Sequence, residues 1–148
     1  MRRPMLLMAI AFGALGFLAG RALPQSPAKA PPTVNFAEVV RTTPIDPERG
    51  GVLTPVLQGE DGTVNVWQLT GTIPPHYHNA HEEYIVVMEG VGDVRLGDET
   101  RPLKVGDIVR VPRKVVHQVT ARGDAPFRGV SFFGPAFDGT DRVFLDAE

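Results

Sequence analysis

The chain has 148 residues, no cysteine and four histidines, and its formal net charge at pH 7 is −2. The lack of cysteine excludes a disulfide framework, a thiolate zinc site, an iron–sulfur cluster and a cysteine nucleophile. Because the net charge is negative and the lysines and arginines are scattered, we expect no nucleic-acid partner. A small-molecule partner is favoured, and any bound metal must be held by nitrogen and oxygen.

The first 22 residues have the pattern of a secretory signal. Arg2 and Arg3 precede an uncharged, mostly apolar stretch over residues 4–20, and small residues suited to a signal peptidase follow. We therefore predict export to the periplasm or the extracellular space. The apolar stretch, about 17 residues long, also reaches the lower limit for spanning a bilayer. An uncleaved membrane anchor through residues 4–20 is the alternative.

The rest of the chain divides into a spacer and one folded domain. Residues 23–34 are rich in proline and alanine and cannot form a core. Over residues 35–148, short β-type runs alternate with glycine-containing turns at a spacing of about 8–12 residues, which is typical of a sandwich or barrel. The predicted runs are 63–70, 84–89, 91–96, 107–111, 116–120, 127–133 and 142–145. No part of this domain has sustained helical periodicity, so we predict an all-β fold with minor helices, and short strands or an edge segment before residue 58.

Three of the four histidines, His76, His78 and His81, fall within six consecutive positions. Alternate side chains of an extended strand point to the same face, so His76 and His78 can close on one metal ion. His81 follows a turn at Asn79-Ala80 and is predicted to be a solvated loop residue. The alternative is that it supports the ligands from behind or replaces one of them.

Candidate partners for this pair lie on the following strands. Glu82 and Glu83 begin an otherwise apolar strand, where a carboxylate needs a partner, and spacing alone does not choose between them. The fourth histidine, His117, alternates with valines, so we expect it to face the interior. A buried imidazole needs a partner for a ring nitrogen, and metal ligation would supply one.

These two segments resemble the two motifs of the cupin superfamily, small β-barrels of jelly-roll type, and the chain is most similar to small single-domain cupins with the type-2 conserved barrel. The matched positions are His76, His78, Glu83 and Gly90 in the first motif, and Gly106, Pro112 and His117 in the second. This match selects Glu83 over Glu82. It implies a single jelly-roll barrel over residues 35–148, with His76, His78, Glu83 and His117 as ligands of one divalent metal ion.

Three positions depart from the family pattern. Gly71 precedes His76 by four residues rather than five, Lys114 replaces a glycine, and Ala121 replaces an asparagine. None of these changes removes an implied metal ligand.

Three imidazoles and one carboxylate suit Fe, Mn, Ni or Co, and Zn where fewer ligands engage. The resemblance thus implies a metal-dependent enzyme of dioxygenase, decarboxylase or isomerase type, with a dioxygenase-like oxidoreductase favoured. Its substrate would be a small organic acid, a sugar or a phenolic compound. Glu83 is also the candidate catalytic residue, because it becomes a general base if it leaves the metal. The alternative is a non-catalytic cupin that binds or senses a small ligand or the metal itself.

The remaining expectations concern packing. Trp67, Phe132 and Phe133 are predicted to lie in the core, and Glu82, Arg110 and Arg128 at the surface. The strand after Glu82 is apolar on both faces, so its outer face needs a cover. Either residues 36–57 or a second subunit would provide it, and we expect a homodimer.

Overall fold

A computed structural model of the chain describes residues 33–145. The predicted signal or anchor over residues 1–22, and all of the predicted spacer except its last two residues, lie outside this range. In the described range a helix, α1 (Phe36–Thr42), precedes ten strands. They are β1 (Gly51–Gln58), β2 (Thr63–Leu69), β3 (Thr72–Tyr77), β4 (Glu82–Glu89), β5 (Val91–Leu96), β6 (Glu99–Lys104), β7 (Ile108–Val111), β8 (His117–Arg122), β9 (Phe127–Gly134) and β10 (Val143–Phe144). No helix within residues 33–145 has the length and apolar character needed to cross a bilayer.

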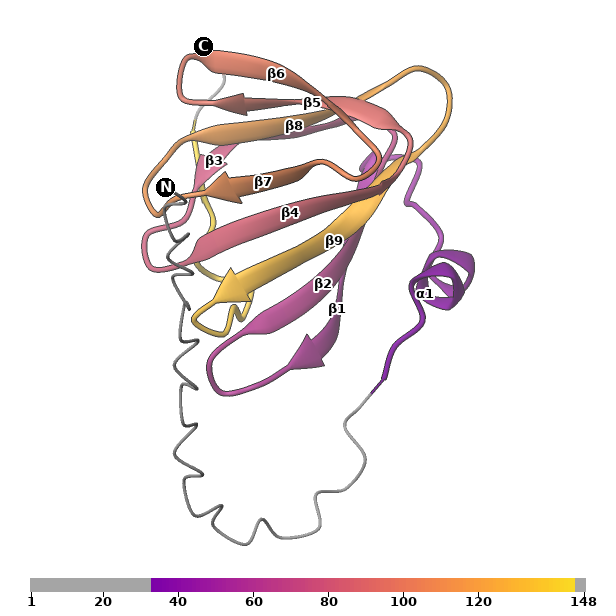
Figure 1. The fold of residues 1–148 in the computed structure, drawn as a ribbon. Coiled ribbons are helices and arrows are strands. Elements are labelled where there is room, and N and C mark those ends of the chain that lie inside the picture. Colours follow the sequence, from indigo (N-terminus) through magenta and orange to yellow (C-terminus); the bar gives the residue numbers. More distant parts are fainter. Residues whose placement is uncertain (1–32, 146–148) are drawn as a thin grey trace, which may run out of the picture. The chain divides into compact units, whose positions relative to one another are not determined.

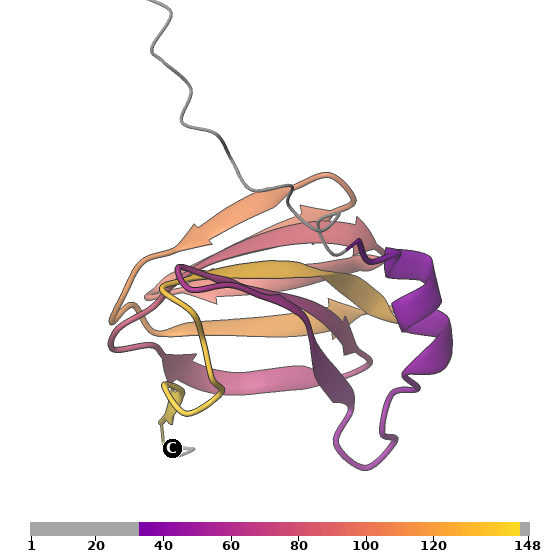
Figure 2. The same cartoon turned by 90° about the horizontal axis from the view of Figure 1, so that it is seen from below.

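The strands form two five-stranded antiparallel sheets, which we call sheet A and sheet B. The strand order is β1-β2-β9-β4-β7 in sheet A and β10-β3-β8-β5-β6 in sheet B. The two sheets face each other across a common interior (Figures 1 and 2). Neighbours in each sheet are mostly distant in sequence, as in a jelly roll. The predicted all-β jelly-roll barrel is confirmed.

The inward-facing side chains of both sheets build the core. Alternation along β4 and β9 places Ile85, Val87 and Phe127 inside, and each is at most 3% exposed. Trp67 of β2 packs edge-on against Phe127, with ring centroids 4.9 Å apart. A Cβ at Gly129 would collide with the Trp67 ring, so only glycine fits beneath the indole. Trp67 is therefore a core residue, as predicted.

The prediction that Phe132 and Phe133 both lie in the core is wrong for Phe132. Phe133 is 3% exposed, whereas Phe132 is 45% exposed on the outer face of sheet A. Neighbouring residues of a strand point to opposite faces, so only one of the two can reach the core.

The helix and strands that were not predicted from the sequence have only weak hydrophobic periodicity. Residues 36–42, where short strands were considered, form α1 instead, and the Asn35 side chain caps this helix by accepting from the Glu38 N–H at 3.1 Å. The edge strand β6 has only one buried residue, Leu103, so no alternation marks it. The prolines of β3 coincide with an irregular register between Ile73 and His76.

The outer face of sheet A is covered in part. Next to α1, the Gln68 amide donates to the Thr43 carbonyl oxygen at 2.6 Å, and Figure 2 shows α1 on the outside of the barrel. Large apolar side chains on β4, β7 and β9 stay 40% exposed or more: Tyr84, Met88, Ile108 and Phe132. Residues 36–57 thus cover only the β2 side of this face.

Candidate metal centre

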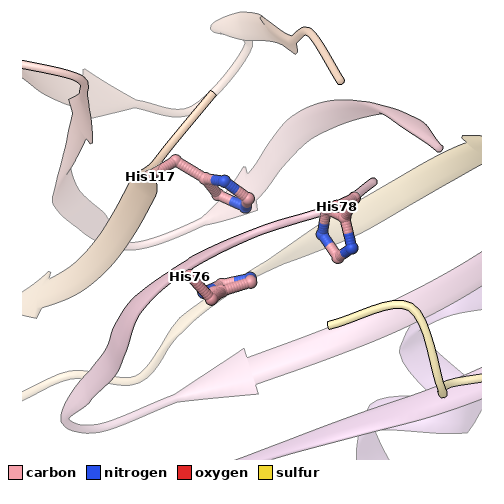
Figure 3. A group of neighbouring side chains, drawn as sticks. All are labelled: His76, His78 and His117. Carbon is pink, nitrogen blue, oxygen red and sulfur yellow. The ribbon is translucent and has the colours of Figure 1, made fainter. Parts of the chain in front are cut away.

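Two neighbouring strands of sheet B and one of sheet A bring four polar side chains to one end of the barrel interior. His76 on β3 is the register partner of His117 on β8, and His78 follows directly after β3. All three imidazoles are at most 2% exposed. One nitrogen of each lies within 4.8 Å of a nitrogen of the other two, and Figure 3 shows the rings turned toward one another. Glu83 of β4 faces them from sheet A.

Backbone carbonyls fix the tautomer of all three histidines. The Nδ1 atoms of His76, His78 and His117 lie 2.8, 2.5 and 3.2 Å from the carbonyl oxygens of Pro74, Asp141 and Val115, respectively. A carbonyl oxygen only accepts, so each Nδ1 carries the proton and donates it. Each Nε2 is therefore left with a free lone pair, which is the form that binds metals.

The free nitrogens converge on the Glu83 carboxylate without a donor between them. Oε2 of Glu83 lies 3.6 Å from Nε2 of His78 and 3.4 Å from Nε2 of His117. Both nitrogens are buried and make no hydrogen bond to any described residue. The other carboxylate oxygen, Oε1, accepts from the Ser131 hydroxyl at 2.6 Å. A carboxylate oxygen that faces two buried, unpartnered imidazole nitrogens, with the His76 ring beside them, fits a cation.

The surroundings of His76 and Glu83 lower the pKa of both groups. Burial and the neighbouring His117 lower the pKa of His76 to about 3, despite the bond to the Pro74 carbonyl. Burial alone would raise the pKa of Glu83. The adjacent His117, His78 and Ser131 outweigh burial and hold that pKa well below its usual range. An unprotonated imidazole and an ionised carboxylate are the forms that metal ligation requires.

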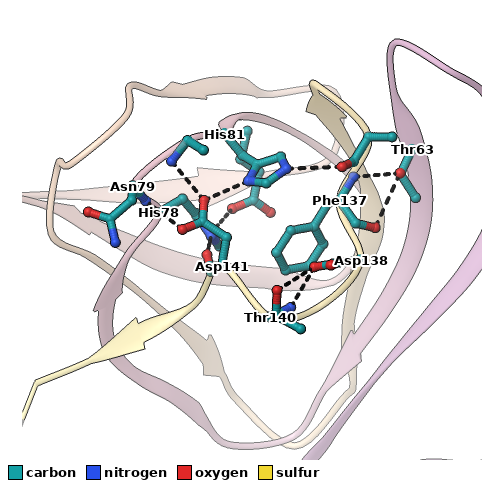
Figure 4. A network of polar contacts seen from close by, with 11 residues as sticks. Thr63, His78, Asn79, His81, Phe137, Asp138, Thr140 and Asp141 are labelled. Carbon is teal, nitrogen blue, oxygen red and sulfur yellow. Dashed lines mark hydrogen bonds and ion pairs between the residues drawn. The ribbon is translucent and has the colours of Figure 1, made fainter.

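A second layer of contacts, centred on Asp141, holds the loop between β3 and β4 (Figure 4). The Asp141 carboxylate accepts from the backbone N–H groups of Asn79 and Ala80 at 2.9 and 2.8 Å. Burial would raise its pKa, but the bonds from His81 and these two N–H groups lower it to about 2. Because the Asp141 carbonyl also accepts from His78, this one residue positions both a candidate ligand and its loop.

The prediction that His81 is a solvated loop residue is wrong. His81 is 7% exposed. Its Nδ1 lies 2.6 Å from the Asp141 carboxylate and its Nε2 lies 3.0 Å from the Ala136 carbonyl oxygen. Both ring nitrogens thus face oxygen acceptors within the fold. His81 supports the loop, and both of its ring nitrogens are engaged by oxygen atoms of the fold rather than directed at the histidine cluster.

Aromatic side chains fix the orientation of His78. The rings of Phe133 and Phe137 stack on each other at 4.4 Å, and each meets the His78 ring edge-on at 5.3 and 5.4 Å. The Phe137 N–H donates to the Thr63 hydroxyl at 2.8 Å, which anchors the segment after β9 to β2. The candidate ligand is therefore packed as well as hydrogen-bonded.

The departures from the family pattern do not disturb the turns next to the site. Lys114, where the family has glycine, has φ of 63°, so it adopts the left-handed conformation that glycine favours. Its N–H donates to the His78 carbonyl at 2.7 Å, which joins the two motif segments. At Gly90 (φ 76°), a Cβ would lie 2.6 Å from the Pro126 carbonyl oxygen, so glycine is required there.

A cavity of about 300 Å³ opens beside the histidines. His76, Glu83, His117 and Ser131 form its polar side, and Arg142 also lines it. Most of its remaining wall is apolar and includes Leu53, Trp67, Leu69, Ile73, Ile85 and Val119. The volume is at the lower end of the range of small-molecule sites.

Sequence analysis identified the four converging side chains but missed the residues around them. Ser131, Phe137, Asp141 and Arg142 reach the site from β9 and from the segment after it. Asp141 lies 60 positions after His81 in the sequence. No local pattern predicts such a contact.

Residues 56–133 match the family described as Cupin domain. This match covers more than half of the chain and includes all four converging side chains. The chain belongs to the cupin family. Cupins commonly bind a metal, and the buried cluster of His76, His78 and His117 fits that property of the family.

Individual proteins resemble this chain over most of its length. Protein SchB of Streptomyces halstedii is 32% identical over 125 residues, which cover 78% of this chain and 91% of SchB. An uncharacterized double-stranded β-helix protein from Klebsiella pneumoniae superposes with a TM-score of 0.63 at 25% identity, covering 78% of this chain and 97% of that one. KdgF from Halomonas superposes with a TM-score of 0.58 at 26% identity, covering 63% and 86%.

Proposed function

We propose that this cupin holds one divalent metal ion, Fe, Mn, Ni, Co or Zn, through Nε2 of His76, His78 and His117 and Oε2 of Glu83. The observation that carries the proposal is the cluster of three buried imidazoles beside the Glu83 carboxylate, in which Nε2 of His78 and of His117 have no partner among the described residues. Three neutral imidazoles and one carboxylate around such an ion leave a net charge of about +1. When bound, the ion would supply a Lewis acid and a template for a chelating substrate.

We further propose that the protein is a metal-dependent enzyme, of dioxygenase, decarboxylase or isomerase type, with the dioxygenase-like reaction favoured. Its substrate, a small organic acid, sugar or phenolic compound, would occupy the cavity beside the histidines. Glu83 is the only acidic side chain among the described residues that line this cavity. With Oε1 fixed by Ser131, Glu83 directs Oε2 toward the histidines, and this oxygen could accept a proton from a bound substrate if it were not ligating the metal.

Metal analysis tests the first part of the proposal. We expect elemental analysis of protein isolated from its own compartment to give one divalent ion per chain. After chelation, calorimetric titration should give one site, which the substitutions His76→Gln and His117→Gln each abolish. His81→Gln is the matched control, because both His81 nitrogens are bonded within the fold. A stoichiometry of one that survives loss of His117 contradicts this ligand set.

Turnover tests the second part. Oxygen uptake and product formation should be followed with a panel of organic acids, sugars and phenols, using the metal-loaded protein. Turnover that disappears with Glu83→Gln supports the enzyme. Full metal occupancy with no turnover of any panel member favours the alternative, a non-catalytic cupin that binds or senses a small ligand or the metal.

Export and pairing complete the proposal. Export rests on the sequence of residues 1–22, and N-terminal sequencing of the mature protein distinguishes cleavage from an uncleaved anchor.

Pairing of two copies rests on the exposed side chains of Tyr84, Met88, Ile108 and Phe132 on one face of sheet A. Sedimentation should give a dimer that Ile108→Lys converts to a monomer, and a monomeric wild type at high concentration contradicts the pairing.

A further inference from the structure

Arg142 is held rigidly at the edge of the cavity. The preceding residue, Asp141, accepts from His78 through its carbonyl and from two loop N–H groups through its carboxylate. The following residues form β10, in which Val143 and Phe144 pair with Tyr77 and His76 of β3. The backbone on both sides of Arg142 is therefore fixed to the segment that carries two of the candidate metal ligands.

The guanidinium of Arg142 has no polar partner in the described part of the chain. Its Nε is buried and makes no hydrogen bond, and the group forms no ion pair with any described carboxylate. The guanidinium lies over the Phe137 ring, whose centroid is 5.8 Å from Cζ. The half-buried Arg128, in contrast, donates to both Glu89 and Gln68.

The Arg142 side chain is half-buried and its buried Nε has no partner. Such an unpaired cationic group is costly, and arginine cannot avoid that cost by losing its proton. Burial lowers the pKa of Arg142, and the charge of Glu83 only partly opposes the effect. If Glu83 ligates a divalent ion, as proposed above, the centre itself carries a charge of about +1. Arg142 and the metal centre then place two positive groups on one small cavity, so the missing partner is an anion.

The cavity walls also limit the chemical class of the anion. The other polar lining residues are the histidines, Glu83, Ser131, Thr72 and Arg49, and Arg49 is already paired with Asp46. The rest of the lining is mostly apolar and includes Trp67, Ile73 and Ile85. Such a wall offers few hydrogen bonds to the many hydroxyl groups of a sugar. It suits an aromatic or branched aliphatic body instead. A guanidinium binds a carboxylate with two parallel N–H···O bonds, which fixes the orientation of that body.

We propose that Arg142 binds the carboxylate of an organic acid whose aromatic or branched aliphatic body fills the apolar part of the cavity, next to the metal centre. This inference rests on the proposed function and selects organic acids from its three substrate classes. Arg142 is thereby a substrate-binding residue contributed by the segment before β10.

Benzoate and its neutral analogue benzamide test the proposal, because they share size and shape. Their binding to the metal-loaded full-length protein can be followed through the fluorescence of Trp67, the single tryptophan, which lines the cavity. We expect benzoate to bind at least about tenfold more tightly than benzamide. Equal binding of the two compounds, or no binding of benzoate, overturns the proposal without any variant.

Three variants test whether Arg142 is responsible for the preference for benzoate. Arg142→Met should weaken benzoate binding by about 10- to 100-fold and leave benzamide binding unchanged, whereas Arg142→Lys, which keeps the charge, should retain part of the preference. Arg95→Met is the matched control, because Arg95 also has a buried, unpartnered Nε but does not line the cavity. Benzoate binding that Arg142→Met leaves intact contradicts the assignment.

Metal content, measured on the same samples, separates the two proposals. One metal per chain without a preference for benzoate refutes the role of Arg142 and leaves the metal centre standing. A preference for benzoate that depends on Arg142 in a protein without metal affinity supports the role of Arg142 and refutes the proposed function.

Discussion

The two ends of the barrel interior are built on the same strands but are lined by different kinds of side chain. At the packed end, apolar side chains fill the space, and Phe127, Val87 and Val94 are at most 1% exposed. At the histidine end, equally buried Nε2 atoms of His78 and His117 have no partner. β4 serves both ends, with Val87 at one and Glu83 at the other. The packed end is complete within the chain, whereas the histidine end is arranged for a group from outside the chain.

The largest expected effect lies at the packed end. Phe127→Ala removes a fully buried ring that packs against Trp67, so the free energy of unfolding should fall by about 3–5 kcal/mol. Urea unfolding of the metal-free protein measures this change. Metal stoichiometry, measured under native conditions, should stay at one. Loss of the metal site in a variant that remains folded would contradict the separation of the two ends.

Metal addition should act on the histidine end alone. At a free metal concentration of about 1,000 times Kd, binding to the native state should raise the free energy of unfolding by about 4 kcal/mol. His117→Gln should abolish this increase. Because the His117 Nε2 has no partner to lose, the metal-free variant should lie within about 1 kcal/mol of the wild type. Thermal unfolding with and without chelator gives both values.

The free energy of unfolding of the metal-free protein should depend on pH, because His76 is buried in its neutral form at the histidine end. The pKa of His76 is about 3 in the folded protein, against about 6.5 in an unfolded chain. The unfolded state therefore binds a proton that the native state excludes, and stability falls as the pH falls from about 6.5 toward 3. We expect a loss of about 2 kcal/mol between pH 6.5 and pH 5.

Urea unfolding in the presence of chelator measures this loss, and His76→Gln should remove it. Ordinary carboxylates contribute little above pH 5, so histidines dominate this window, and the difference between the wild type and His76→Gln gives the part that is due to His76. Stability that stays constant or rises on acidification would contradict a neutral, buried His76.

The smallest expected effect concerns the support of the histidine end. Asp141→Asn weakens the bonds to His81 and to the loop N–H groups, so metal affinity should fall about tenfold, or about 1.4 kcal/mol. Asp138→Asn is the matched control, because Asp138 bonds only Thr140. Calorimetric titration measures both affinities, and an equal loss in the two variants would contradict the positioning role of Asp141.

The sequence predicted the parts of the fold and site that depend on local patterns. The H-x-H spacing placed His76 and His78 together, and the alternation of valines around His117 predicted its burial, because strand periodicity is visible within a few residues. The predicted runs beginning at residues 63, 91 and 127 correspond to β2, β5 and β9.

The sequence was least informative for residues whose environment depends on contacts with distant parts of the chain. The contact of His81 with Asp141 joins residues 60 positions apart, so the turn alone suggested solvation. Arg142 looked like an ordinary strand residue because only the folded chain places it on the cavity. The error at Phe132 was avoidable, since strand alternation already excludes Phe132 and Phe133 from sharing one face.

The three Nδ1–H···O=C bonds also set the proton balance of the centre. Each candidate ligand keeps its single ring proton on the nitrogen that faces the backbone, away from Glu83. With its low pKa, His76 has no second proton to release at neutral pH. A metal ion that binds would therefore displace no proton from His76. Protons would compete with the metal for His76 only when the pH approaches the His76 pKa of about 3. At neutral pH, a metal ion that binds there would therefore meet no competition from protons on His76.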